Sequence, residues 1–191
     1  MGRTSDAKER LLQSGATLFH TKGYQAVGVQ EICTHANVKK GSFYYFFSTK
    51  RDLAVTILEE QTNQFQPFLK KTLATAGSRA DKVEALFEAA SNMQAAYLAE
   101  TQQIPGCPVG NLALEMSPHD NTLRQAVGES LSRFSRTIQT ALLEADPNTP
   151  TASQQAEAVV ALLEGALMLA KNQNDPERIR QMIPFARQLV Q

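Results

Sequence analysis

Apolar residues recur every three to four positions along almost the whole chain, and this period constrains the fold more than any other feature. It is clearest in the series Leu123, Val127, Leu131, Phe134, Ile138 and Leu142. Such a series places its side chains on one face of a helix, and no strand-like alternation of useful length competes with it. The 191 residues are 42% hydrophobic, which is enough to bury a core and excludes a disordered chain. The sequence therefore predicts an all-α protein of about nine helices.

Glycine, proline and capping residues separate the predicted helices. The expected helices cover residues 5–21, 29–36, 39–46, 53–65, 83–97, 121–142, 152–171 and 177–190, with a short apolar stretch at 109–116. Gly23 is expected to end the first helix, and Ser48 or Thr49 to cap the long helix that follows residue 50. Pro67 is expected to kink that long helix or end its first part. Asp175 and the proline after it are expected to open one continuous final helix.

The formal net charge is zero, but the charges are unevenly distributed. Residues 1–52 hold eight basic and four acidic residues, a net charge of +4, so the remaining 139 residues carry −4. This asymmetry favours a basic binding module joined to an acidic body, although solvated helix faces often differ by this much by chance.

Residues 38–50 carry the chemistry of the basic module. Two short helices joined by a tight turn, with basic and small residues opening the second, are typical of a helix-turn-helix. Gly41 lets the backbone approach base edges, and Lys39 and Lys40 can reach guanine or a phosphate. The side chains suited to phosphate oxygens are Ser42, Tyr44, Tyr45 and Lys50. Phe43 and Phe47 are expected to face inward, and an ordinary aromatic core beneath a solvated lysine face is the alternative.

Residues 8–53 resemble the DNA-binding head of the TetR family of bacterial repressors. The matching features are Leu18-Phe19, Gly23-Tyr24, Val29 to Ile32, Gly41-Ser42-Phe43-Tyr44-Tyr45, Phe47 and Lys50. The resemblance implies a helix-turn-helix domain over residues 1–50 and a helical effector-sensing and dimerisation domain over residues 51–191. It implies base contacts from Lys40 and Gly41, and phosphate contacts from Tyr44, Tyr45 and Lys50.

The sequence departs from the family pattern at two positions of the head. Gly28 stands where the family usually has Thr or Ser, and a glycine can cap a helix but offers no side chain to a phosphate. Phe46 replaces the usual His before Phe47, which removes any polar contact from that position. Two backbone contacts to DNA are therefore in doubt.

A head this small needs two copies, because one short helix contacts too few base pairs. The apolar helix over residues 152–171 and the helix over 177–190 can be buried within one subunit or pair across a two-fold axis. The resemblance favours the second, since family members dimerise through their last two long helices. A homodimer on palindromic double-stranded operator DNA is expected.

The signal is expected to enter through the helical body. Side chains available to line a cavity are Phe65, Phe68, Phe87, Met93, Tyr97, Met116, Phe134 and Met168, and ordinary core packing is the alternative for each. Cys107 lies near a helix start, where a thiolate is favoured, and Asn111 follows in the same segment. That segment resembles an N-ethylmaleimide-responsive TetR subgroup, in which Lys171 takes the place of a lysine near the sensing cysteine. The alternative is that Cys107 is a small buried hydrophobe, whereas Cys33 is expected to be buried packing.

The function expected is therefore a ligand- or redox-responsive repressor. An enzyme is not expected, because His20, His35 and His119 pair with no nucleophile and neither a phosphate-binding glycine loop nor zinc spacing occurs. No cofactor and no metal is expected. No membrane span is expected either, since the most apolar stretch, 156–170, contains two glutamates. The N-terminus has no apolar run, so the cytoplasm is expected. A helical protein-interaction adaptor without DNA binding is the alternative.

Overall fold

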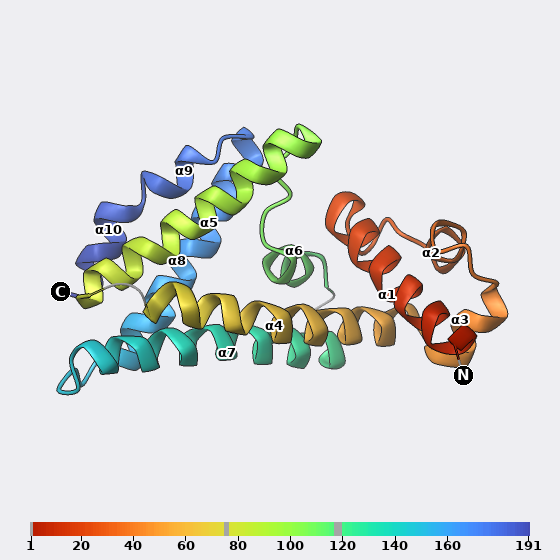
Figure 1. The fold of residues 1–191 in the computed structure, drawn as a ribbon, viewed down its shortest axis with the longest axis horizontal. Helices are drawn as coiled ribbons and strands as arrows, with labels where there is room; N and C mark the ends of the chain where they lie inside the picture. The colour runs from red at the N-terminus through yellow and green to blue at the C-terminus, as the bar shows by residue number, and fades with distance from the viewer. Residues whose placement is uncertain (1, 75–76, 117–119) are drawn as a thin grey trace. The chain divides into compact units, whose positions relative to one another are not determined.

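The computed structural model describes residues 2–74, 77–116 and 120–191, which leaves His119 outside. The described residues form ten α-helices and no strand, which confirms the expected all-α fold (Figure 1). In chain order the helices are α1 (Gly2–Lys22), α2 (Val29–His35), α3 (Lys40–Phe46), α4 (Lys50–Ala74), α5 (Arg79–Thr101), α6 (Pro108–Glu115), α7 (Asn121–Ala145), α8 (Ala152–Gln173), α9 (Glu177–Arg180) and α10 (Ile183–Gln188).

The chain forms two compact units, each built from two segments. The first joins Met1–Thr62 to Pro108–Ser130, and the second joins Asn63–Cys107 to Leu131–Gln191. The first unit thus adds the start of α4, all of α6 and the start of α7 to α1, α2 and α3. The division into residues 1–50 and 51–191 remains a prediction about the two functional parts.

Helices α1, α2 and α3 pack against one another in the first unit. Their buried core consists of Leu11, Leu12, Leu18, Val27, Ile32, Cys33, Ala36, Phe43, Phe47, Leu53 and Ile57. Gly23 ends α1 with a φ of 88°, and its N–H donates to the Phe19 carbonyl at 3.0 Å. Cys33 is buried in this core as expected, and burial raises the pKa of its thiol while the charge of Lys40 opposes that shift.

The start of α4 is fixed by a reciprocal cap. The Asp52 N–H donates to Thr49 Oγ1 at 3.1 Å, and the Thr49 N–H donates to Asp52 Oδ2 at 3.0 Å. The helix then continues through Pro67 to Ala74, so the alternative of a helix end at Pro67 is wrong. A helical proline sacrifices one backbone hydrogen bond, and the burial of Leu69 and Leu73 beyond it offsets that loss.

In the second unit, α5 begins with a capping box between Ser78 and Asp81. Its first turn also carries the buried Lys82, whose Nζ donates to the Leu73 carbonyl at 2.7 Å and so joins α5 to the end of α4. Helices α9 and α10 pack against α5, and α9 also packs against α8.

The expectation of one continuous helix over residues 177–190 is wrong. Two short helices, α9 and α10, replace it, with a turn at residues 181–182. Pro184 lies in the first turn of α10, where its missing N–H costs nothing but prevents a continuous helix from Arg180. Asp175 still serves the start of α9, because its Oδ1 accepts the Glu177 N–H at 3.0 Å. No helix among the described residues is long and apolar enough to cross a membrane.

Candidate DNA-binding surface and sensing residues

Helix α3 has two chemically different faces. Phe43 is fully buried, and its ring centroid lies 5.9 Å from that of Phe47 in the core beneath the helix. Tyr44 and Tyr45 are 52% and 75% exposed, so their hydroxyls are available to phosphate oxygens. Exposed aromatic rings gain little from burial, so these two tyrosines are candidates for a contact outside the chain.

The residues that open α3 lie at the surface. Lys39, its N-cap, and Lys40, its first residue, are exposed, as is Gly41, while Ser42 is half-buried. A Cβ added at Gly41 would meet nothing within 4 Å, so the backbone there faces open space. This arrangement suits close approach of a duplex, with two ammonium groups beside the glycine.

Lys50 is half-buried and bonded to the backbone of the segment after α1. Its Nζ donates to the carbonyls of Tyr24 at 2.7 Å and Val27 at 2.8 Å, and lies 4.2 Å from the centroid of the Tyr24 ring. Burial lowers the pKa of this ammonium, and the charge of Glu115 opposes that shift. An ammonium has three N–H donors, so one remains beyond the two carbonyl bonds for a phosphate.

The two departures from the family pattern have visible consequences. Gly28 is the N-cap of α2 and makes no side-chain cap hydrogen bond. Phe46 is half-buried, with its ring centroid 4.9 Å from that of Tyr45 and 6.5 Å from that of Phe47. Phe46 therefore supports Tyr45 through ring contact instead of offering a polar group.

Arg10 is a supporting residue that the sequence did not reveal. Its Nη1 donates to the carbonyls of Ala36 at 3.2 Å and Asn37 at 3.3 Å, which ties α1 to the turn between α2 and α3. Asn37 adopts a φ of 51°, a left-handed conformation that asparagine tolerates better than most residues. In the sequence, Asn37 directly after the predicted helix over residues 29–36 is the signal that indicates this tight turn.

Cys107 lies in a loop held by side chains of the second unit. Gln94, which is buried, accepts the Gly106 N–H through Oε1 at 3.2 Å and donates through Nε2 to the Gly106 carbonyl at 3.5 Å. Asn174 Oδ1 accepts the Ile104 N–H at 2.9 Å. The thiol of half-buried Cys107 hydrogen-bonds the carboxyl of Glu164 on α8.

Glu164, the partner of the Cys107 thiol, has a perturbed pKa. Burial raises the pKa of Glu164, and the hydrogen bond with Cys107 opposes that shift. Burial and the Cys107 thiol therefore act on the pKa of this carboxyl in opposite directions. Sequence reasoning missed this partner, because 57 residues separate Cys107 from Glu164 along the chain. Lys171 is exposed two helical turns further along α8.

Of the predicted sensing residues, Asn111 lines one of the two hollows described below, and the others line neither of these two. Phe65 and Phe134 meet edge to face at 5.4 Å, and Phe68 lies 5.5 Å from Phe65. Met93 is half-buried and Tyr97 is partly exposed, both on α5. Three further candidates are Phe87, which is fully buried core, Met168, which is exposed, and Met116, which is half-buried.

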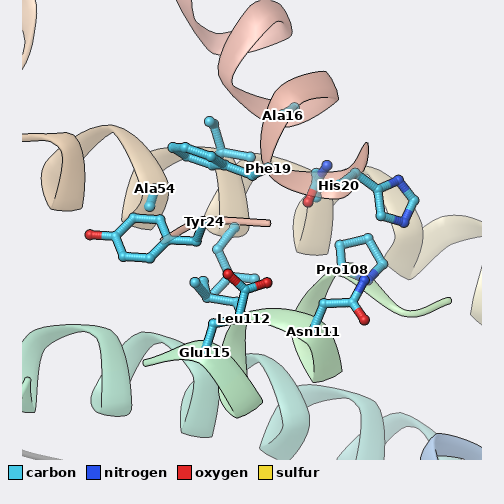
Figure 2. Close-up of a pocket in the computed structure, with 12 residues that line it drawn as sticks. Ala16, Phe19, His20, Tyr24, Ala54, Pro108, Asn111, Leu112 and Glu115 are labelled. Atoms are coloured by element: carbon cyan, nitrogen blue, oxygen red, sulfur yellow. The ribbon is translucent and has the colours of Figure 1, made fainter. Parts of the chain in front are cut away.

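Asn111 instead lines a small hollow in the first unit. The hollow has a volume of about 30 Å³, the size of a water molecule or two, and lies between α1, α4 and α6. Figure 2 shows Asn111 and Glu115 on α6 with Tyr24 and His20 from the end of α1 and the turn after it. It is too small for an organic effector.

A larger hollow of about 620 Å³ lies in the second unit between α4 and α7. Its lining consists of Gln66, Lys70, Leu73, Ala74, Arg133, Arg136, Thr137, Thr140, Ala141 and Glu144. The volume falls in the range of small-molecule sites, and none of the predicted sensing residues lines it. Among the residues described, no three His, Cys, Asp or Glu side chains cluster as metal ligands would.

Two family matches cover most of the chain. Residues 11–57 match the bacterial regulatory proteins of the tetR family, and residues 80–183 match the C-terminal domain of LmrA/YxaF-like transcriptional regulators. The HTH-type transcriptional regulator LmrA of Bacillus subtilis is 30% identical over 190 residues, which cover 94% of this chain and 95% of LmrA. The chain belongs to the TetR family. It is a transcriptional regulator and not an enzyme, as its sequence resemblance implied.

Solved structures of other regulators agree with this assignment. The crystal structure of reduced Escherichia coli NemR superposes with a TM-score of 0.82 at 25% identity, over 96% of this chain and 97% of NemR. The regulatory protein TetR from Rhodobacter sphaeroides gives the same TM-score at 26% identity, over 96% and 98% of the two chains. NemR is named a transcriptional repressor. The regulator described here therefore shares both the fold and the DNA-binding head of its family.

Proposed function

We propose that this regulator is a homodimeric repressor that binds a palindromic operator through α3. The observation that carries the proposal is the division of α3 into a buried Phe43 and an exposed pair, Tyr44 and Tyr45. The proposed contacts are bases at Lys39, Lys40 and Gly41, and phosphates at Ser42, Tyr44, Tyr45 and Lys50. Binding to chromosomal DNA would place the protein in the cytoplasm.

A gel shift with the DNA immediately upstream of the regulator's own gene tests this proposal. Salt-dependent, saturable retardation of that fragment but not of a shuffled fragment is the expected result, because phosphate contacts release counterions. A protein-interaction adaptor would retard neither fragment, and that outcome would refute the repressor proposal.

We propose further that dimerisation uses α8 together with the α9–α10 segment. Met168, Leu169 and Phe185 support this, because all three are large apolar side chains exposed on these helices. Large apolar side chains left exposed are costly in water, and their burial is typical of a subunit interface. Sedimentation that gives only a 21.0 kDa species at micromolar concentration would refute the dimer.

We propose that the inducing signal is sensed in the helical body, either as an electrophile at Cys107 or as a small molecule. The contact of the Cys107 thiol with Glu164 supports the first, since the carboxylate can take the thiol proton as sulfur attacks an electrophilic carbon. Lys171, Phe65, Met93, Tyr97, Asn111 and Phe134 remain the other proposed sensing residues. Helix movement would then mismatch the two heads with half-sites about 34–36 Å apart.

Cys107→Ser separates the two signals. If electrophiles act at Cys107, the variant keeps operator affinity but is no longer released by N-ethylmaleimide. Normal release of the variant would remove the covalent route. The α4–α7 hollow would then become the first place to seek a bound effector.

A further inference from the structure

The turn between α1 and α2 lacks the local devices that normally fix a helix entry. It runs from Gly23 to Gly28, and the N-cap residue Gly28 has no side chain to bond the free N–H groups of α2. Because α2 packs directly against α3, an unfixed turn would leave the recognition helix poorly oriented. Side chains from two distant helices hold the turn instead.

Lys50, the first residue of α4, donates hydrogen bonds to the carbonyls of Tyr24 and Val27 in this turn. Glu115, the last residue of α6, is hydrogen-bonded to Gln25 in the same turn. The Gln25 N–H donates to Glu115 Oε2 at 3.0 Å, and Gln25 Nε2 donates to the Glu115 carbonyl at 3.1 Å. The turn is therefore bonded on its carbonyls by a cation and on an N–H by a carboxylate.

The backbone of the turn is shaped around the Glu115 carboxylate. Figure 2 shows the Glu115 side chain extending from α6 toward the Tyr24 segment. A Cβ on Gly23 would lie 2.8 Å from Glu115 Oε2, closer than van der Waals contact allows. Glycine at residue 23 leaves room for this carboxylate and also suits the positive φ there.

We propose that Glu115 is a positioning residue for DNA binding, which acts by holding the α1–α2 turn and hence the helix-turn-helix. The inference rests on the proposed DNA-binding role of α3. It adds a residue 65 positions beyond Lys50, on a helix that the sequence assigned to the sensing body. Glu115 touches no DNA in this proposal, so its effect is transmitted through Gln25.

The sign of the effect separates positioning from plain electrostatics. A carboxylate in a DNA-binding unit repels phosphate, so removing it for electrostatic reasons alone strengthens DNA binding. Loss of the Gln25–Glu115 hydrogen bonds weakens binding instead. Without them the recognition helix is less ordered in the free protein, so DNA binding must supply the free energy to order it. Loss of the Gln25–Glu115 hydrogen bonds is expected to weaken the complex roughly tenfold, a change of about 1.4 kcal/mol.

The test compares Glu115→Ala, Glu115→Gln and the control Glu60→Ala by fluorescence anisotropy on the upstream DNA fragment. Glu60 is exposed on α4 within the same unit, so its removal changes the charge equally without touching the turn. Glu115→Ala is expected to bind roughly tenfold more weakly than wild type. Glu115→Gln is expected to recover most of the affinity, because its amide oxygen still accepts the Gln25 N–H. Glu60→Ala is expected to bind as wild type or slightly more tightly.

The melting temperature of each variant is measured beside its affinity for DNA. Gln25→Ala is a second variant that tests the same contact. That variant loses the bond to the Glu115 carbonyl, and a smaller loss of affinity without a lower melting temperature is expected. Wild-type affinity in Glu115→Ala, or an equal loss in Glu60→Ala, would overturn the positioning role. Absence of binding by the wild-type protein would instead overturn the DNA-binding proposal on which it rests.

Discussion

Neighbouring residues on α3 should separate folding from DNA binding. Phe43 is fully buried, and a phenylalanine side chain removes about 150–250 Å² from water. At about 25 cal/mol per Å² the ring contributes roughly 4–6 kcal/mol, and measured Phe→Ala substitutions in cores cost about 3–5 kcal/mol. Phe43→Ala is therefore expected to cost about 4 kcal/mol, a large share of the roughly 5–15 kcal/mol that stabilises a typical protein.

Tyr45→Phe should have the opposite pattern. Tyr45 is 75% exposed and the substitution keeps its ring against Phe46, so the change in stability should stay within about 0.5 kcal/mol. The lost hydroxyl removes a hydrogen bond to a charged phosphate oxygen. That loss predicts roughly tenfold weaker operator binding.

Urea unfolding followed by circular dichroism measures the first quantity, and anisotropy on the upstream DNA fragment measures the second. Phe43→Ala should lose stability, whereas Tyr45→Phe should keep its stability and lose affinity for DNA. A Tyr45→Phe variant that is as unstable as Phe43→Ala, or that binds DNA as wild type, would refute the assignment of the two faces of α3.

Three further predictions concern the second unit. Ser78→Ala removes the capping box of α5 and should lower stability by about 1 kcal/mol, seen as a melting temperature about 2–4 °C lower; an unchanged melt would contradict the cap's role. Because burial raises the folded-state pKa of Glu164, wild-type stability should fall as pH rises from about 4.3 through that pKa. Glu164→Gln should lose this pH dependence and exceed wild type at neutral pH in urea titrations, whereas parallel pH curves would refute the burial cost. Phe185→Glu places a charge on the proposed dimer face and should sediment as a folded 21.0 kDa monomer; a retained dimer would exclude that face.

The helices were predictable because each depends on neighbours in sequence. The period of apolar residues predicted α7 and α8, and the capping residue Thr49 predicted the start of α4. Pro67 misled in part, since whether a proline ends a helix depends on tertiary packing that local sequence does not encode. Pro184 was overlooked inside an apolar periodic pattern, although its missing N–H divides the final segment.

The long-range clamps could not be predicted from the sequence. Gln25 and Glu115 are 90 residues apart, and Gln94 reaches the loop before Cys107 from another helix. Single polar residues of this kind have no period and no motif, so the sequence does not distinguish them from solvated surface. The exposed residues of α3 were predictable because a spaced motif carries them together.

The division of the chain into two units also changes how its charge bears on DNA binding. Residues 1–52 carry +4, but the first unit as a whole holds nine basic and nine acidic residues. Two of the five added acids lie beside the start of α4, where Asp120 pairs with Arg51 at 3.8 Å and the charge of Glu115 acts on Lys50. The net charge of the unit therefore cannot attract DNA, and the attraction must come from where the charges lie. If Lys39 and Lys40, exposed at the start of α3, make the main electrostatic contacts as proposed, the salt dependence of operator binding should be shallower than eight basic residues would give.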